Sequence, residues 1–551
     1  MRFFNIILFF FLLGCNPKNE NNKVHIIESI GLIKSKSEDL KEKENWYFKD
    51  VIKDTIPGIS LNKSLNYLKN QKIRDTIIIA VIDRPIDLNH KDLKNHIWIN
   101  KNEIPSNNID DDGNGYIDDI NGWNFKGTED GKQIEYVQNE STRIIRKFDE
   151  RFKNDSTGIT GREDSLNYAL YKEAKSIYQA QNKTLKKDIA YIKMLDSLRQ
   201  ATKNSLSKYI PNQDFTIENL DSLKNVRPGD VLLQDDIIRM TNFLKYEITD
   251  EYIKNYKLIN DKTASILLNT DFNDRQLLGD NPEDIEDKTY GNNILNTNVE
   301  NATHAIRVAG VIIGVGDKHT FLNKSIKIMP IVTSAEGEVH DKDLALGIRY
   351  AVDNGAKVIN MSFSKQLSMH KDWVKDAYQY ASKNDVLIIS SAGNEAENLD
   401  ENNNYYPNDT DIKGIEITDN FLLIGASTYT ADESLLAQFT NYGNRDVDIF
   451  APGYEIKTMV PNNTYKIDSG TSLSAALVSK VAALIWSYYP NLKASEVKQI
   501  LMKSGTAYYI DVEVRQKDGS KKLIPFSSLS KSGKILNAYN ALKMAELVSK
   551  F

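Results

Sequence analysis

The chain has 551 residues, of which 40% are hydrophobic and 26% are charged. This composition is typical of a soluble globular protein and excludes a multi-span membrane protein. With 70 Lys and Arg residues against 76 Asp and Glu residues, the formal net charge of −6 does not favour nucleic acid as a partner.

The N-terminus predicts export and a lipid anchor. Cys15 is the only cysteine in the sequence, which excludes disulfides within the chain and thiolate zinc sites. A basic start and an apolar run from Phe3 to Leu13, too short to span a bilayer, lead up to Cys15. The pattern resembles a bacterial lipoprotein signal, in which residues 1–14 are removed and the cysteine is lipidated; an ordinary secretory signal is the alternative. Residues 15–45 would form a tether and N-terminal extension outside the cytoplasm, on the periplasmic or cell-surface side of the membrane.

Apolar runs alternate with helical patterns along most of the remaining chain. Leu61, Leu65 and Leu68 predict an amphipathic helix, and a continuous apolar run at 76–82 predicts a strand that is buried on both faces. Further strands are predicted at 326–332, 357–361, 386–391 and 421–425, and helices at 342–354 and 371–384. This alternation predicts an α/β fold with a doubly wound, mostly parallel sheet.

Residues 126–285 break the alternation and divide the main domain into 46–125 and 286–551. The segment contains neither Gly nor Pro between Gly161 and Pro211, and apolar residues from Leu185 to Leu198 recur at the helical period. We expect a helical insertion packed on the main domain, with a second helix near 235–256. An exposed charged hairpin without chemistry of its own is favoured over a separate binding module.

Ser472 is a candidate nucleophile. It follows Gly470-Thr471 and precedes an apolar run, Ala475–Trp486, that predicts a buried helix. Free N–H groups at such a helix N-terminus can stabilise an oxyanion. The site is not the G-x-S-x-G elbow of α/β-hydrolases, because Ser474 takes the place of the second glycine. The alternative is that Thr471 or Ser472 only caps the helix.

The partners of this serine can be sought among the seven histidines and the ends of the strands. Only His304 directly precedes a small-residue apolar segment, 308–314, and the other histidines are expected in polar loops or at the surface. Asp83 ends the first strand, at the edge where open α/β sheets place their sites. The chain order Asp83, His304, Ser472 is that of subtilisin.

The sequence around these three residues resembles the subtilisin-like serine peptidases, from about Trp46 to Val548. AVIDRPID at 80–87 is similar to the family's A-V-I-D-S-G-I-D motif. HAIRVAG at 304–310 is similar to H-G-T-H-V-A-G, and GTSLSAA at 470–476 is similar to G-T-S-M-A-A-P. In addition, GAKVINMS at 355–362 resembles the family's substrate-lining strand, and SAGN at 391–394 resembles its A-A-G-N motif. The long Asp-to-His spacing is similar to that of a bacterial branch with an insertion there.

The resemblance implies a serine endopeptidase that cleaves polypeptides through an acyl-enzyme intermediate. Ser472 would attack the carbonyl, His304 would transfer the proton, Asp83 would orient the imidazole, and Asn394 would donate to the oxyanion. The substrate-binding residues that the resemblance implies are Asn360, Met361, Ser362, Ala392 and Gly393. No organic cofactor is expected.

Several neighbours of the triad depart from the family pattern. Arg84 and Pro85 replace Ser and Gly after Asp83, and Ala305, Ile306 and Arg307 replace Gly, Thr and His after His304. Arg84 is expected to lower the pKa of Asp83 and to compete with His304 for its hydrogen bonds. A slow but working peptidase is favoured over a catalytically impaired pseudopeptidase that binds polypeptides; a lipase-like hydrolase is disfavoured by the triad order.

Residues 108–119, NIDDDGNGYIDD, resemble an EF-hand calcium loop. Oxygen-bearing side chains alternate, Gly113 is sixth and a carboxylate is twelfth. The candidate ligands of a structural calcium ion (Ca2+) are Asn108, Asp110, Asp112, Asn114, Asp118 and Asp119. The alternative is a turn of solvated acidic residues.

Overall fold

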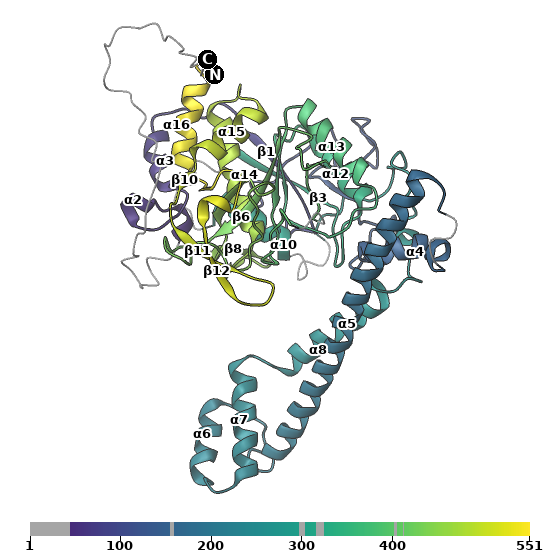
Figure 1. Cartoon of the computed structure of the whole chain (residues 1–551), viewed down its shortest axis with the longest axis vertical. Coiled ribbons are helices and arrows are strands. Elements are labelled where there is room, and N and C mark those ends of the chain that lie inside the picture. Colours follow the sequence, from purple (N-terminus) through teal and green to yellow (C-terminus); the bar gives the residue numbers. More distant parts are fainter. Residues whose placement is uncertain are drawn as a thin grey trace, which may run out of the picture.

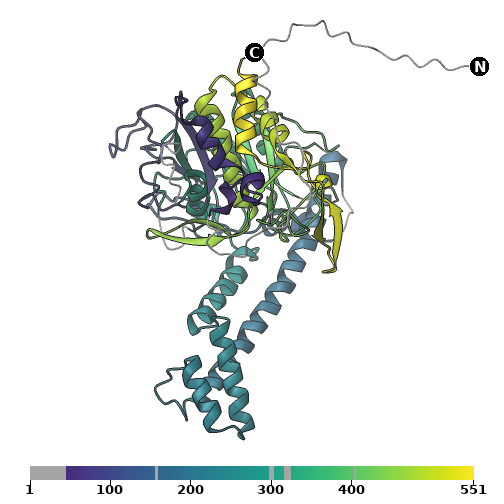
Figure 2. The same cartoon turned by 90° about the vertical axis from the view of Figure 1, so that its left-hand side faces the viewer.

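The computed structural model describes residues 45–154, 159–296, 303–315, 324–401, 405–411 and 413–550. The predicted signal, the lipidation site Cys15 and the tether lie outside these residues. Figure 1 shows a body built around a sheet and a long helical arm that extends away from it. The view in Figure 2, turned by 90°, shows the same separation of body and arm.

The sheet of the body is mostly parallel. In the described part of the chain it has nine strands, in the order β10 (Thr506–Ala507), β13 (Lys534–Ile535), β7 (Ile449–Pro452), β6 (Phe421–Ser427), β5 (Leu387–Ser391), β4 (Val358–Met361), β1 (Ile77–Asp83), β3 (Ile326–Val332) and β2 (Trp123–Asn124). Every pair is parallel except β10 with β13. Two antiparallel hairpins lie apart from it, formed by β8 (Ile456–Val460) with β9 (Thr464–Asp468) and by β11 (Asp511–Arg515) with β12 (Lys521–Pro525).

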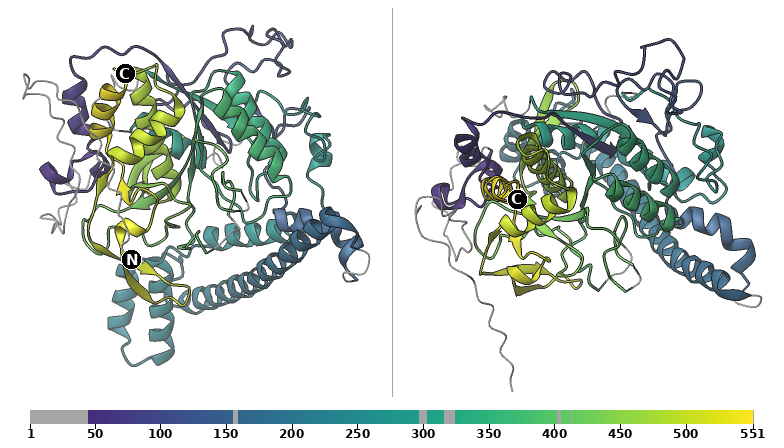
Figure 3. Two further views of the ribbon diagram at one scale, coloured as in Figure 1. Left: turned by 45° about the horizontal axis from the view of Figure 1, so that its top comes forward. Right: turned by 90° about the horizontal axis from the view of Figure 1, so that it is seen from above.

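Helices cover both faces of the sheet, which confirms the doubly wound α/β fold. One face packs against α3 (Leu61–Leu68), α10 (Thr303–Ile313), α14 (Thr471–Tyr488), α15 (Ala494–Ser504) and α16 (Ala538–Val548). The other face packs against α12 (Asp341–Asp353) and α13 (Lys371–Lys383), and Figure 3 shows the two groups on opposite sides. Successive side chains of β1 alternate between the cores, with Val81 in the first and Ile82 in the second, so a continuous apolar run is needed.

Short elements complete the body and lead into the arm. They are η1 (Trp46–Phe48), α2 (Val51–Asp54), α4 (Glu140–Phe152), α9 (Arg275–Leu278) and η3 (Phe526–Ser528). Residues 126–139, predicted as part of the helical insertion, instead run along the sheet edge: Tyr136 bridges to Glu336 in a parallel sense.

The arm consists of α5 (Gly161–Leu206), α6 (Ile217–Val226), α7 (Val231–Lys245), α8 (Asp250–Lys262) and the π-helical turn η2 (Thr263–Leu267). With 46 residues, α5 is about 69 Å long at about 1.5 Å per residue. A small apolar core joins α5 to α6, α7 and α8 at the far end (Figure 1). The single helix predicted near 235–256 is instead two helices, because Glu247 has a φ of 53° and Thr249 caps α8 by accepting the Tyr252 N–H.

A buried group of charges fixes the base of the arm to the body. This root cluster comprises Lys126, Asp274, Arg275, Asp280, His340, Lys342 and Asp343. Asp343 of α12 lies 2.6 Å from Lys126 Nζ and 2.8 Å from Arg275 Nη1. His340 Nε2 lies 2.7 Å from Asp274 Oδ2. His340 lies in the loop before α12, as expected, but it is buried rather than exposed, and a carboxylate partners it there.

Candidate active site

Asp83 lies at the carboxyl end of β1, in the middle of the sheet. Its backbone carbonyl accepts the N–H groups of Thr333 and Ser334, which follow the neighbouring strand β3. Its side chain is 4% exposed, and its Oδ1 accepts the Arg84 N–H at 2.7 Å. The carboxylate is thus held in a fixed orientation at the edge of the sheet.

His304 and Ser472 lie at the N-termini of the two helices that pack beside this edge. His304 is in the first turn of α10, and its Nδ1 is 2.9 Å and 2.8 Å from the two carboxylate oxygens of Asp83. Its Nε2 is 3.2 Å from the Oγ of Ser472, the second residue of α14. The structure therefore brings Asp83, His304 and Ser472 together in one hydrogen-bonded line.

Asn394 lies directly beside the start of α14. Its Oδ1 accepts both the backbone N–H and the hydroxyl of Thr471, each at 3.0 Å. This arrangement leaves the Asn394 amide Nδ2 as a donor next to Ser472, whose own N–H lies in the unpaired first turn of a helix. Thr471 Oγ1 also accepts the Gly393 N–H at 3.1 Å. Sequence reasoning missed this positioning role of Thr471, which it treated only as a helix cap.

The two arginines that depart from the family pattern do not engage the triad side chains. The Arg84 guanidinium pairs with Glu336, so only its backbone N–H reaches Asp83. The expected competition between the Arg84 side chain and His304 is therefore absent from the described contacts. Arg307 pairs with Asp468 at the end of the β8–β9 hairpin. The two substitutions leave the hydrogen bonds of the triad intact, because Glu336 and Asp468 pair with the two arginine side chains.

A cleft of about 300 Å³ opens beside Asp83 and His304 of the triad. Its walls include Asp83, His304, Gly337–Val339 and Ser362–Ser364. Of the predicted substrate-binding residues, only Ser362 lines it. Asn360, Met361, Ala392 and Gly393 are buried and do not line this cleft, although Gly393 lies next to the nucleophile through its bond to Thr471.

These buried residues support the cleft from behind. Asn360 Nδ2 donates to Ser362 Oγ at 2.8 Å, and Asn360 Oδ1 accepts the Ser479 hydroxyl at 3.0 Å. Ser362 in turn accepts a hydrogen bond from Ser472 Oγ on its carbonyl oxygen, at 3.1 Å. The end of β4 is thereby tied to the candidate nucleophile.

The acidic loop at 108–119 is folded, but only part of the predicted ligand set converges. Ligand oxygens of Asp112 and Asp119 lie within 4.8 Å of one another and of Glu103, which sequence reasoning missed because it precedes the twelve-residue pattern. Burial raises the pKa of Asp119 to about 6. A set of three carboxylates fits calcium, which prefers oxygen ligands.

The other predicted ligands serve the loop's own backbone. Asp118 accepts the N–H groups of Asn107 and Asn108, and Asp110 accepts that of Gly115. Asn114 lies closer to the cluster, because its Nδ2 donates to Asp119 Oδ2 at 3.1 Å. Asp110 and Asp118 are thus not among the three clustered carboxylates, and Asn108 remains a predicted ligand.

Comparison with known proteins agrees with this geometry. The subtilase family profile matches residues 74–522. The cell wall-associated protease of Bacillus subtilis is 30% identical over 283 residues, which cover 51% of this chain but only 29% of that protein. Subtilisin DY of Bacillus licheniformis is 27% identical over 213 residues, covering 38% of this chain and 72% of that protein. A solved cold adapted subtilisin-like serine proteinase superposes on 40% of this chain and 73% of its own, with 24% identity and a TM-score of 0.32, too low to add to the assignment. The profile match over most of its length shows that the chain belongs to the subtilase family.

Proposed function

We propose that the protein is a serine endopeptidase that acts on polypeptides outside the cytoplasm. Ser472 is the nucleophile, His304 the general base and acid, and Asp83 the group that orients the imidazole. Asn394 and the Ser472 N–H donate to the oxyanion, and a donor of this kind is typically worth about 3 to 4 kcal/mol. The observation that carries the proposal is the line of contacts from Asp83 through His304 to Ser472 Oγ.

The reaction then proceeds in two halves. Ser472 Oγ attacks the scissile carbonyl carbon while His304 Nε2 takes its proton, and the same proton passes to the leaving amine. Water, deprotonated by His304, next attacks the resulting ester and releases the acyl half with Ser472 restored. Asp83 stays ionised throughout and stabilises the imidazolium.

The test is labelling with a fluorophosphonate probe, which reacts with an activated serine. Wild type should label, and Ser472→Ala should not. Ser469→Ala is the matched control, because Ser469 lies three residues earlier and its Oγ accepts the Glu455 N–H instead of contacting the triad. If wild type neither labels nor cleaves a denatured protein, the alternative of a pseudopeptidase that binds polypeptides replaces this function.

We also propose a structural calcium ion held by Glu103, Asp112 and Asp119. The ion would neutralise carboxylates that lie within 4.8 Å of one another and would fix the loop between β1 and the sheet edge. It takes no part in the chemistry, because Asp119 is bonded to Tyr350 of α12, on the face of the sheet away from α10 and α14.

Export and lipid anchoring are proposed from the sequence around Cys15. Among the described residues no helix is long and apolar enough to cross a bilayer. Two or three acyl chains at an N-terminal cysteine would hold the protein stably on a membrane where one would not. Cys15→Ser should therefore move the protein from the membrane fraction to the soluble fraction, and unchanged retention would refute the anchor.

A further inference from the structure

The geometry at Ser472 leaves one direction for the acyl part of a substrate. The leaving amine must face His304, which supplies its proton, and the carbonyl oxygen must face Asn394 and the Ser472 N–H. The third substituent of the carbonyl carbon is the α-carbon of the residue before the scissile bond, called P1. It must therefore point toward Ser362–Ser364 at the end of β4, where the Ser362 carbonyl already contacts Ser472 Oγ.

The space beside this position is bounded by the ends of β4 and β5. Gly393, which follows β5, is bonded to Thr471 next to the nucleophile and has a φ of 99°. Ser364, which follows β4, lines the cleft of the triad. A P1 side chain has to enter between these two strand ends.

Tyr405 is one of three residues packed against Gly393. A Cβ at this glycine would be 3.1 Å from Tyr405 Cε2 and 2.5 Å from both Asn441 Nδ2 and Glu395 Oε2. The Tyr405 hydroxyl donates to the Ser391 carbonyl of β5. The side chain is thus fixed to the β5 wall, and the residue is only 7% exposed.

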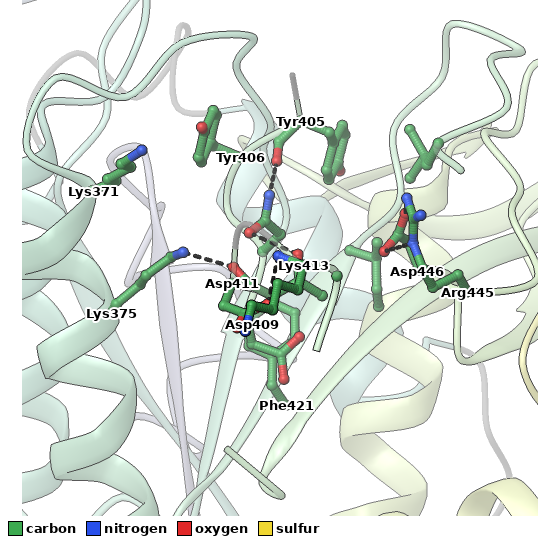
Figure 4. Close-up of a pocket in the computed structure, with 15 residues that line it drawn as sticks. Lys371, Lys375, Tyr405, Tyr406, Asp409, Asp411, Lys413, Phe421, Arg445 and Asp446 are labelled. Atoms are coloured by element: carbon green, nitrogen blue, oxygen red, sulfur yellow. Dashed lines mark hydrogen bonds and ion pairs between the residues drawn. The ribbon is translucent and has the colours of Figure 1, made fainter. Parts of the chain in front are cut away.

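Tyr405 also lines a larger open space. A pocket of about 430 Å³ is lined by Tyr405 together with Lys371, Lys375, Asp409 and Arg445. Figure 4 shows Lys371 and Lys375 on one side of it, Arg445 with Asp446 on the other, and Tyr405 at one end. Tyr405 therefore contacts both Gly393, beside the nucleophile, and a cavity large enough for a bulky side chain.

We propose that Tyr405 closes the P1 subsite, so that the enzyme cleaves after small residues such as Gly, Ala or Ser and rejects large ones. The inference rests on the proposed peptidase function and deepens it by assigning the substrate class. Tyr405 determines specificity and takes no part in the proton transfers, so its removal changes which bonds are cut while Ser472 remains reactive.

The experiment is digestion of a denatured protein mixture, with the cleavage sites read by mass spectrometry. Wild type should cut almost entirely after Gly, Ala and Ser. Tyr405→Ala should raise cuts after Leu, Met and Phe by about tenfold or more, the scale on which a hydrophobic pocket discriminates side-chain size. Tyr405→Phe is the matched control: it keeps the ring and loses the hydroxyl, and should retain the wild-type profile.

Labelling of each variant with the fluorophosphonate probe separates two kinds of failure. Absence of labelling in wild type overturns the peptidase function and this inference with it. A labelled wild type that makes no cuts overturns the endopeptidase function and this inference together. A labelled wild type that cuts after Phe and Leu as often as after Ala overturns the role of Tyr405 alone. So does a labelled Tyr405→Ala variant with the wild-type profile. The wild-type profile decides the matter even if Tyr405→Ala does not fold.

Discussion

The root cluster makes a sharp prediction, because a single carboxylate holds two buried cations. Asp343 bonds Lys126, Arg275 and the hydroxyl of Tyr290, the last at 2.6 Å. Although burial alone would raise it, Arg275 and Lys126 hold the pKa of Asp343 well below its usual range. Its stabilising contribution is therefore fully present at pH 7 and is lost only as the pH falls through the lowered folded-state value.

Asp343→Asn keeps the shape of the side chain and removes its charge. The variant leaves Lys126 buried without the carboxylate that pairs with it, while Arg275 keeps Asp280, and we expect it to lower the free energy of unfolding by about 3 to 5 kcal/mol. The matched control is Asp130→Asn: Asp130 pairs with Lys132 at the surface, where the two side chains are 56% and 79% exposed. Its loss should cost no more than about 0.5 kcal/mol.

Urea unfolding at pH 7, followed by tryptophan fluorescence, measures both variants against wild type. A shift in midpoint at unchanged slope reports the change in stability. Removing one partner of a buried ion pair normally costs more than about 1 kcal/mol. If the free energy of unfolding of Asp343→Asn lies within about 1 kcal/mol of the wild-type value, the cluster is not paired as described.

Three further predictions concern pH, catalysis and calcium. Burial lowers the pKa of His340 to about 3, so between about pH 6.5 and 3 the unfolded state binds a proton that the folded state does not, and stability should fall as the pH drops through this range. Between pH 7 and 4 the melting temperature of His340→Gln should therefore fall less than that of wild type. An equal fall in wild type and variant would contradict this. Asn394→Ala should reduce kcat on a denatured protein substrate about 10²- to 10³-fold, while the fluorophosphonate probe still labels the same residue. Undiminished turnover would exclude the Asn394 amide as an oxyanion donor. Chelation of calcium should lower the melting temperature of wild type but not of the double variant Asp112→Ala with Asp119→Ala, and a wild type indifferent to chelator would remove the ion from the structure.

The sequence predicts the sheet well because its strands are buried on both faces. Each apolar run predicted as a strand, such as 326–332, is a strand in the structure, and the predicted ends of the two helices at 342–354 and 371–384 differ from the observed ones by one residue at most. Short motifs likewise identify Asp83, His304 and Ser472, since each stands at an element end that its own neighbours determine. The strands and the three motifs depend on neighbouring residues in the chain, so the sequence alone is enough to predict them.

The features that the sequence does not reveal depend on contacts between distant segments. Lys126 and Asp343 are charged residues of the type that normally stays in water, and nothing near either predicts that they are buried together. Glu103 joins the acidic loop from outside the twelve-residue pattern, and Tyr405 reaches the active site from a loop beyond β5. No Gly or Pro marks the break before α8, which a backbone turn at Glu247 produces instead.

The position of the arm within the chain has a consequence for biosynthesis. Among the described strands β1 pairs only with β3 and β4, and both follow the arm in the sequence. Asp83 therefore has no partner until His304 and β3 have been translated, 221 positions and more later. At about 5 to 20 residues per second, that interval is on the order of 10 to 40 seconds. The arm has an apolar core of its own, so we expect it to fold before the sheet is complete, while the apolar β1 is still unpaired. The active site is then completed only when the second half of the sheet arrives, which keeps the nascent chain from carrying a working protease.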